Sequence, residues 1–378
     1  MAKLLLDTGE IFEGKSIGYE GTSFGEICFN TSMTGYQEIL TDPSYAEQIV
    51  VMTYPEIGNY GINKDDFEYK KIRTNGIIIK NYCEKESHYK SSSKLSDYLI
   101  SNKVVGISNI DTRRLTNIIR NNGAMNCVIT SGEVTEDIRQ ELRTFGVSKN
   151  ISEIVSRSQI DIMEKKSNKL RVGVIDTGVK KSILDILHNN GCNLVIFPAN
   201  TTSDEILKFK LDSVLISNGP GNPEDATNTI ETVTELVGKI PLYGICLGYQ
   251  ILSIVLGAKT YKLKYGHRGG NHPVINLETN KVYMTSQNHG YAVDTTSLAT
   301  GLIPTYKNLN DETLEGFRCP TLEIQGVQFH PESAPGPDDA VGILLGWIEE
   351  MKDRKNLRGL RGFFKRLRGD DKCQKITI

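Results

Sequence analysis

The sequence predicts an α/β protein of two domains, in which a strand-rich α/β domain precedes a doubly wound, mostly parallel sheet. A chain of 378 residues is longer than one hydrophobic core normally spans. Before residue 150, glycine turns separate short alternating runs, which are typical of short strands. Further on, apolar runs alternate with helical runs, as in parallel sheets with crossover helices. The apolar runs are 170–176, 194–197, 213–217 and 240–245, and the helical runs are 179–190, 226–238 and 249–257.

These patterns divide the chain into four segments: an N-terminal domain over 1–150, a linker over 151–169, a second domain over 170–350 and a basic tail over 351–378. The tail has ten Lys or Arg against three Asp, so its net charge of +7 leaves −9 on the rest of a chain that carries −2. Apolar residues recur in the tail at helical spacing. A solvated C-terminus would explain this basic tail, and so would docking on an acidic partner or, weakly, on an anionic membrane or nucleic acid.

Late runs in the second domain, near 282–285, 291–293, 313–318 and 322–329, predict antiparallel strands.

The composition indicates an ordinary soluble protein, with 38% hydrophobic and 24% charged residues. No stretch approaches the ~20 apolar residues of a membrane span. Residues 1–7 are charged too soon for a signal peptide. Seven cysteines without C-x-x-C spacing argue against a disulfide framework and against a zinc site. We therefore expect a cytoplasmic protein that binds neither a membrane nor a nucleic acid.

The segment Gly244-Ile245-Cys246-Leu247-Gly248 joins an apolar strand to a helical run, as in a nucleophile elbow. An elbow needs small flanking residues because the nucleophile sits on a sharp turn. The helix N-terminus favours a thiolate at Cys246, and the amide of Leu247 points to where an oxyanion would develop. A free cysteine is more often a small buried apolar residue. Two glycines at this spacing nevertheless favour an acyl-transfer site.

His330 follows the alternating run 322–329 and so lies at the carboxyl end of a predicted strand, where open α/β sheets bind ligands. Pro331 ends that strand, and Glu332 is placed to orient the imidazole or to stabilise its charge. Taken alone, His-Pro-Glu is more often a capped turn. Together with the elbow it predicts a Cys246–His330–Glu332 triad.

A loop from Asn218 to Pro223 follows another apolar run, 214–217. Gly219 and Gly221 let its backbone N–H groups come close to a ligand. The loop lacks the third glycine and the helix of a dinucleotide site, which disfavours nucleotide binding. A tight strand-to-helix connection is the alternative interpretation.

Two other patterns are rejected as sites. Residues 9–16 match the letters of a P-loop, but a hairpin turn is predicted at Gly9, no helix follows and two glutamates would repel phosphate. We therefore expect no nucleotide site in this chain. His267, His272 and His289 lie in glycine-rich or turn sequences, and metal ligation would need tighter clustering with carboxylates or cysteines. They predict structural or substrate-lining roles and no metal site.

Three of these motifs, G-P-G at 219–221, G-I-C-L-G-x-Q at 244–250 and H-P-E at 330–332, together resemble a class I, triad-type glutamine amidotransferase. The rest of the chain is similar to the small subunit of carbamoyl-phosphate synthase. The stretches that carry this second resemblance are 34–45, 54–61, 106–107, 110–116, 266–273 and 286–291, and it extends from about residue 3 to about residue 350.

The resemblance implies an enzyme, the glutamine-hydrolysing subunit of carbamoyl-phosphate synthase. Cys246 would form a glutamyl thioester, His330 would act as base and then acid, and Glu332 would orient the imidazole. A heterodimeric partner, the large synthetase subunit, would use the ammonia to make carbamoyl phosphate from bicarbonate and ATP for arginine biosynthesis, pyrimidine biosynthesis or both. ATP and Mg are expected only in that partner, and no cofactor in this chain. The glutamine-binding residues would be Ser44, Gly219, Gly221, Leu247, Gln250, Asn288, Gly290 and Tyr291.

One departure and two rival readings accompany this resemblance. Tyr249 stands where the family usually has His, which leaves His330 as the base. A first rival is a non-catalytic regulatory or scaffolding subunit with an inert elbow, which the complete Cys–His–Glu set disfavours. A second is an amidotransferase serving another synthase, of the anthranilate or guanylate type, which the extra N-terminal domain disfavours.

Overall fold

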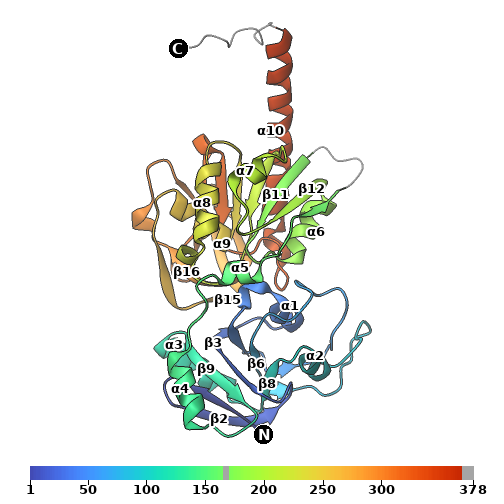
Figure 1. Ribbon diagram of the computed structural model, residues 1–378, viewed down its shortest axis with the longest axis vertical. Helices are drawn as coiled ribbons and strands as arrows, with labels where there is room; N and C mark the ends of the chain where they lie inside the picture. Colours follow the sequence, from blue (N-terminus) through green and yellow to red (C-terminus); the bar gives the residue numbers. More distant parts are fainter. Residues whose placement is uncertain (165–169, 368–378) are drawn as a thin grey trace.

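The computed structural model describes the backbone of residues 1–164 and 170–367, arranged as two stacked bodies (Figure 1). Residues 165–169 of the expected linker and 368–378 of the expected tail lie outside the described part. The segment 151–164 is not extended throughout, because it contains helix α5 (Ile151–Val155) and strand β10 (Asp161–Met163). Since β10 pairs antiparallel with β12 (Cys192–Pro198), the chain joins the second sheet before residue 170.

A closed barrel forms the first body, with strand order β1-β2-β8-β6-β4-β3-β9. Alternate strand residues point inward, among them Leu4, Ile49 and Ile129, which are all fully buried. The barrel strands are β1 (Ala2–Leu6), β2 (Ile11–Ser16), β3 (Thr22–Asn30), β4 (Gln48–Met52), β6 (Gly76–Ile78), β8 (Val105–Ser108) and β9 (Met125–Thr130). The remaining elements of this body are α1 (Tyr36–Thr41), α2 (Leu95–Ser101), α3 (Thr112–Asn122), α4 (Glu136–Thr144) and the strand pair β5 (Glu56–Ile57) and β7 (Asn81–Tyr82).

The P-loop-like letters at residues 9–16 belong to a β-hairpin. Strand β2 pairs antiparallel with β1, with Leu5 opposite Ile11 and Ala2 opposite Gly14. A phosphate cradle would need a helix after the glycine-rich turn. The hairpin turn that the sequence predicts at Gly9 is therefore confirmed.

A ten-stranded mixed sheet forms the second body, in the order β10-β12-β11-β13-β14-β19-β18-β17-β15-β16. The pairs from β12 to β19 are parallel, and the strands beyond them on both sides are antiparallel. The expected antiparallel run 322–329 contains β19, which pairs parallel with β14 and antiparallel with β18. The strands not yet given are β11 (Leu170–Asp176), β13 (Ser213–Ile216), β14 (Leu242–Ile245), β15 (Thr260–Asn276), β16 (Val282–Val293), β17 (Ile303–Asn308), β18 (Leu314–Cys319) and β19 (Ile324–Val327).

Helices cover both faces of the parallel part, which makes the sheet doubly wound as predicted (Figure 1). Val172 and Val174 of β11 face α6 and α10, whereas the next residue, Ile175, faces α7, α8 and α9. This alternation follows from the twofold period of a strand. The helices are α6 (Lys181–Asn189), α7 (Ser203–Leu207), α8 (Thr227–Leu236), α9 (Leu247–Val255) and α10 (Val341–Leu367).

Sequence patterns missed β15 and the centre of β16. The 266–273 and 286–291 stretches read as turns because glycine and proline usually interrupt strands. In the structure β15 absorbs them as irregularities, with register shifts against β16 between Lys262 and His267 and between Gly269 and His272. His267, His272 and His289 consequently lie on strands and not in turns.

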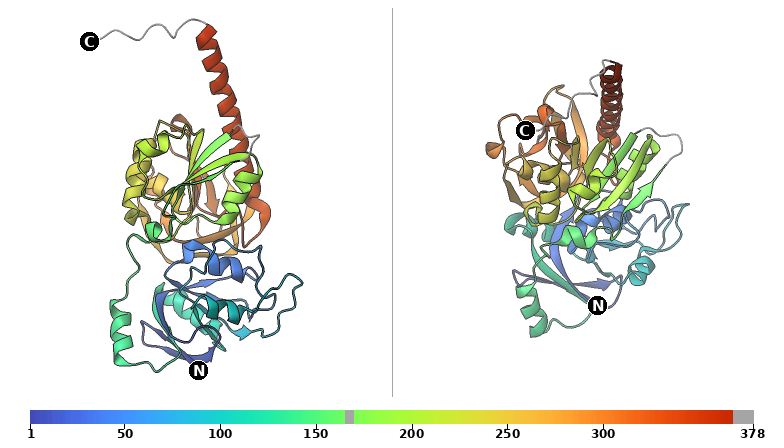
Figure 2. Two further views of the ribbon diagram at one scale, coloured as in Figure 1. Left: turned by 45° about the vertical axis from the view of Figure 1, so that its right-hand side comes forward. Right: turned by 45° about the horizontal axis from the view of Figure 1, so that its top comes forward.

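Helix α10 carries the chain out of the second body and continues to Leu367 (Figure 2). Its first turns pack on the sheet through Leu344, Trp347 and Ile348. Part of the expected basic tail is thus helical backbone, and the rest of that tail lies outside the described residues.

We expect Gly248→Ala to disrupt the elbow. A Cβ atom at Gly248 would lie 2.1 Å from the carbonyl oxygen of Ile216, a backbone atom that cannot move aside. Crowding of this kind costs about 1–3 kcal/mol of folding free energy. Chemical denaturation should show that loss for Gly248→Ala. Gly346→Ala, with nothing within 4 Å of the added methyl group, is the control and should retain full stability.

Candidate active site

Cys246 sits on the turn between β14 and α9. It is the N-cap of α9, with φ 53° and ψ −105°, and is 1% exposed. A positive φ is rare outside glycine and marks a strained turn. Its sulfur lies 3.7 Å from the carbonyl oxygen of Asn288. This geometry is the elbow that the sequence predicts.

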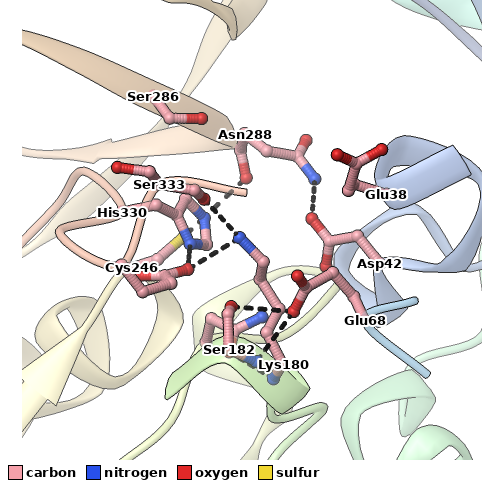
Figure 3. A network of polar contacts seen from close by, with 12 residues as sticks. Glu38, Asp42, Glu68, Lys180, Ser182, Cys246, Ser286, Asn288, His330 and Ser333 are labelled. Carbon is pink, nitrogen blue, oxygen red and sulfur yellow. Dashed lines mark hydrogen bonds and ion pairs between the residues drawn. The ribbon is translucent and has the colours of Figure 1, made fainter. Parts of the chain in front are cut away.

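His330 and Glu332 lie a few residues after the end of β19, at the carboxyl edge of the parallel strands. The backbone N–H of His330 donates to the carbonyl of Ser286, which fixes the segment against β16. His330 Nδ1 lies 2.6 Å from Glu332 Oε1, and both side chains are buried. His330 Nε2 makes no hydrogen bond of normal geometry within the described residues, and Figure 3 draws the Cys246 sulfur beside the ring.

Lys180 is a buried cation that the sequence analysis missed. Its Nζ donates to Glu332 Oε1 and to the carbonyl of Ser333, both at 2.8 Å (Figure 3). It follows β11 at the same sheet edge as Cys246. That position, at the carboxyl end of a predicted parallel strand, was the available signal.

The three charged groups shift one another's pKa values. Burial lowers the pKa of His330, and so does Lys180, but the Glu332 carboxylate and the neighbouring Cys246 side chain outweigh them, so that the pKa is raised to about 10. Burial raises the pKa of Glu332, but Lys180 and His330 together lower it to about 2. Burial lowers the pKa of Lys180, and the carboxylates of Glu332, Glu68 and Asp42 raise it above its ordinary value. At neutral pH the site therefore holds an imidazolium, a carboxylate and an ammonium.

The first body contributes side chains to the same edge (Figure 3). Ser44 Oγ accepts from Asn218 Nδ2 at 2.9 Å, and Asp42 Oδ2 accepts from Asn288 Nδ2 at 3.2 Å. Glu68 accepts from the backbone N–H and the hydroxyl of Ser182 at the start of α6. These contacts hold the two bodies together at the sheet edge that carries Cys246 and His330.

A cavity of about 160 Å³ opens onto the Cys246 side chain between the two bodies. Of the residues predicted to bind glutamine, all but Leu247 line it, namely Ser44, Gly219, Gly221, Gln250, Asn288, Gly290 and Tyr291. Leu247 is the first residue of α9, where backbone N–H groups have no intrahelical acceptor. The charged lining residues that the sequence analysis did not single out are Glu26, Asp225, Lys262 and Arg268.

Tyr249 points away from this cavity. It is fully buried, its hydroxyl donates to the carbonyl of Leu314, and its ring lies 5.3 Å from that of Phe317. It therefore fills the core on the other side of α9. This orientation explains why the site can lack a histidine at position 249.

The carboxyl group of Glu38, near the boundary between the two bodies, should make the folding stability depend on pH. Its Oε2 is buried without a partner among the described residues, and burial raises its pKa from 4.5 to about 7. Because the pKa of Glu38 is higher in the folded than in the unfolded state, its burial costs no folding free energy below pH 4.5. Above that pH the folded state loses stability as the pH rises through about 7. We expect Glu38→Gln to remove this loss and to be up to about 3 kcal/mol more stable than the wild type at about pH 8, but not below about pH 4.5. Urea unfolding at both pH values measures this, with the exposed Glu312→Gln as a control that should not change the profile.

Comparison with known proteins identifies the family. Residues 4–129 match the model for the carbamoyl-phosphate synthase small chain, CPSase domain, and residues 173–346 match class-I glutamine amidotransferase. The chain belongs to the carbamoyl-phosphate synthase small-chain family. It is therefore a glutamine-hydrolysing amidotransferase subunit, and membership of this family implies a large-subunit partner.

Similar small chains extend over nearly the whole length. The carbamoyl phosphate synthase small chain of Clostridium acetobutylicum is 46% identical over 89% of this chain and 96% of its own. That of Clostridium perfringens is 45% identical, covering 90% and 96%. The pyrimidine-specific small chain of Bacillus subtilis is 43% identical, covering 93% and 96%. Among the described residues, no helix has the length and apolarity to cross a membrane.

Proposed function

We propose that Cys246, His330 and Glu332 hydrolyse glutamine through a thioester and release ammonia for a large synthetase subunit that makes carbamoyl phosphate from bicarbonate and ATP. The observation that carries the proposal is the strained cysteine at a helix N-terminus beside a buried imidazole–carboxylate pair. Helix N-termini favour a thiolate, and a neighbouring imidazolium favours it further.

In the first step the Cys246 thiolate attacks the side-chain carboxamide carbon of glutamine. Backbone N–H groups of Leu247 and of Gly219 or Gly221 would stabilise the tetrahedral oxyanion. His330, which is protonated at neutral pH because of Glu332, gives its proton to the departing nitrogen. Ammonia leaves, and a γ-glutamyl thioester remains on the sulfur.

In the second step the neutral imidazole of His330 takes a proton from water, which attacks the thioester carbon. The sulfur leaves as thiolate, and the products are glutamate and the resting imidazolium. The balance is one glutamine and one water to one glutamate and one ammonia. Gln250 supports the cavity wall, since its Nε2 donates to the carbonyl of Tyr291 at 2.8 Å and to Gln328 Oε1 at 2.9 Å.

Ser44, Asn288, Gly290 and Tyr291 are proposed to hold the α-amino acid end of glutamine, because they line the cavity from both bodies. The Bacillus subtilis relative is a pyrimidine-specific small chain, which favours pyrimidine biosynthesis over arginine biosynthesis as the consumer of the product.

Covalent labelling separates a working site from an inert scaffold. A glutamine analogue with a chloromethyl ketone in place of the carboxamide should label Cys246 stoichiometrically, and excess glutamine should prevent the reaction. Cys246→Ser should abolish labelling, whereas Cys83→Ser, which changes a partly exposed thiol outside the cavity, should leave it unchanged. Labelling that glutamine does not prevent, or that spreads equally over other cysteines, would refute a glutamine site at Cys246.

A further inference from the structure

A buried cluster of polar side chains lies on the antiparallel side of the sheet, outside the proposed triad. His267 of β15 and His289 of β16 are opposite each other in register, and Glu315 of β18 reaches the same place. One nitrogen of each imidazole and a carboxylate oxygen all lie within 4.8 Å of one another, and all three residues are buried. The sequence analysis did not expect this clustering, because β15 was not recognised and Glu315 was not singled out.

The spacing of the donor atoms fits a shared metal ion. Gln287 Oε1 lies 3.0 Å from His267 Nδ1 and 3.0 Å from His289 Nε2. His267 Nδ1 lies 3.6 Å from Glu315 Oε1. Ligands bound at about 2.1 Å in tetrahedral or octahedral geometry are separated by roughly 3.0–3.4 Å. Gln287 shares the side of β16 that carries His289, since the two are two residues apart.

The outer nitrogens of both imidazoles are held as they are in known metal sites. His267 Nε2 lies 2.9 Å from Asp311 Oδ2, and His289 Nδ1 lies 2.7 Å from the carbonyl oxygen of Tyr291. Ligating histidines typically donate the second N–H to a carboxylate or a backbone carbonyl. With the proton on the outer nitrogen, the inner nitrogen of each neutral ring presents a lone pair to the cluster.

With both rings neutral in this way, acceptors converge without a donor among the described residues. Burial lowers the pKa of His267, but Asp311 and Glu315 outweigh burial and raise it to about 9, so a proton on the inner nitrogen is the donor that a metal ion would replace. The two inner nitrogens face Gln287 Oε1, which is also an acceptor. Glu315 Oε1 accepts from Asn308 Nδ2, but Glu315 Oε2 is fully buried and has no partner there. Buried acceptors and a buried carboxylate require compensation. A cation among them would compensate all of them together.

We propose that His267, His289 and Glu315, with Gln287 as a fourth donor, bind a zinc ion that ties β15, β16 and β18 together. Two imidazoles with a carboxylate form a donor set that zinc accepts in four-coordinate sites. Protein ligands occupy all four positions, so the ion is structural. It would fix the backbone of β16 at His289, which lines the cavity together with Asn288 and Gly290.

Metal content tests the site directly. The full-length chain, purified without a histidine tag or added metal, should contain roughly stoichiometric zinc by inductively coupled plasma mass spectrometry. His267→Gln and Glu315→Gln should contain at least about tenfold less. His272→Gln is the matched control, because its ring is 5.0 Å from that of His267 but is not among the proposed ligands, and it should keep the metal. Chelation should lower the melting temperature of the wild type and of His272→Gln only.

The alternative to a metal ion is a different orientation of the Gln287 amide. Turned by half a rotation, the amide NH₂ group would donate to both imidazoles without a cation. A wild-type chain that contains no metal and takes up none from a zinc solution would overturn the proposal, as would zinc retained in full by Glu315→Gln. A further expectation, a higher KM for glutamine after zinc loss, rests on the proposed function. Metal content is measured without glutamine, so failure of the triad would leave the zinc result intact.

Discussion

Cys246→Ser is expected to abolish glutamine-dependent carbamoyl phosphate synthesis by the complex with its large subunit, while ammonia-dependent synthesis continues at the wild-type rate. A serine hydroxyl fits the same turn, but it is far less nucleophilic than a thiolate at neutral pH, and His330 is already protonated there. The glutamine-dependent rate should fall by at least about 10³-fold. Parallel assays with glutamine and with an ammonium salt measure both activities in one preparation.

The ammonia arm of this assay is its internal control. Unchanged ammonia-dependent synthesis shows that the large subunit is active, and co-elution of the two subunits in gel filtration shows that the variant folds and assembles with its partner. Loss of both activities would contradict the division of labour between the subunits. Residual glutamine-dependent activity near the wild-type level would mean that another group attacks the carboxamide.

Lys180→Met is expected to reduce glutamine hydrolysis by about 10²-fold and to move the acid limb of its pH profile to higher pH. Lys180 lowers the pKa of His330, so its removal should raise that pKa further. The neutral imidazole needed to activate water is then scarcer at neutral pH, and the second step slows. Loss of a buried cation beside Glu332 also costs about 3–5 kcal/mol of folding free energy.

Lys181→Met is the matched control for Lys180→Met. Its side chain is 55% exposed, and its ammonium group pairs with Asp185 on the surface of α6. It should change neither the rate nor the pH profile. Expressing each glutamine-dependent rate per amount of small chain that co-elutes with the large subunit corrects for loss of folded protein. An equal loss of rate for Lys180→Met at every pH would show that Lys180 has only a structural role.

The sequence could predict the parts of the site that depend on local pattern. Cys246 and His330 follow short apolar runs, and a parallel sheet brings the carboxyl ends of such runs to one edge. The glycines at 244 and 248 identified the turn because only a residue without a side chain fits there, as the 2.1 Å approach at Gly248 shows. The doubly wound architecture could be predicted because the alternation of strands and helices is also a local pattern in the sequence.

The parts that escaped prediction depend on contacts between distant segments. Lys180 lies 152 residues before its partner Glu332, and Asp42 lies 246 residues before Asn288. Contacts between residues so far apart in the chain leave no periodic pattern in the local sequence. Strand β15 escaped because Gly266 and Gly269, with positive φ, are turn signals locally, and only pairing with β16 keeps them in a strand.

Mass analysis of the chain during turnover tests the central claim most directly. The complex is mixed with saturating glutamine, quenched in acid and digested, and the peptide containing Cys246 is weighed. We expect a glutamyl adduct on that sulfur alone, together with glutamyl hydroxamate when hydroxylamine is added during turnover. Continued release of ammonia from glutamine with no adduct on Cys246 and no hydroxamate would contradict it.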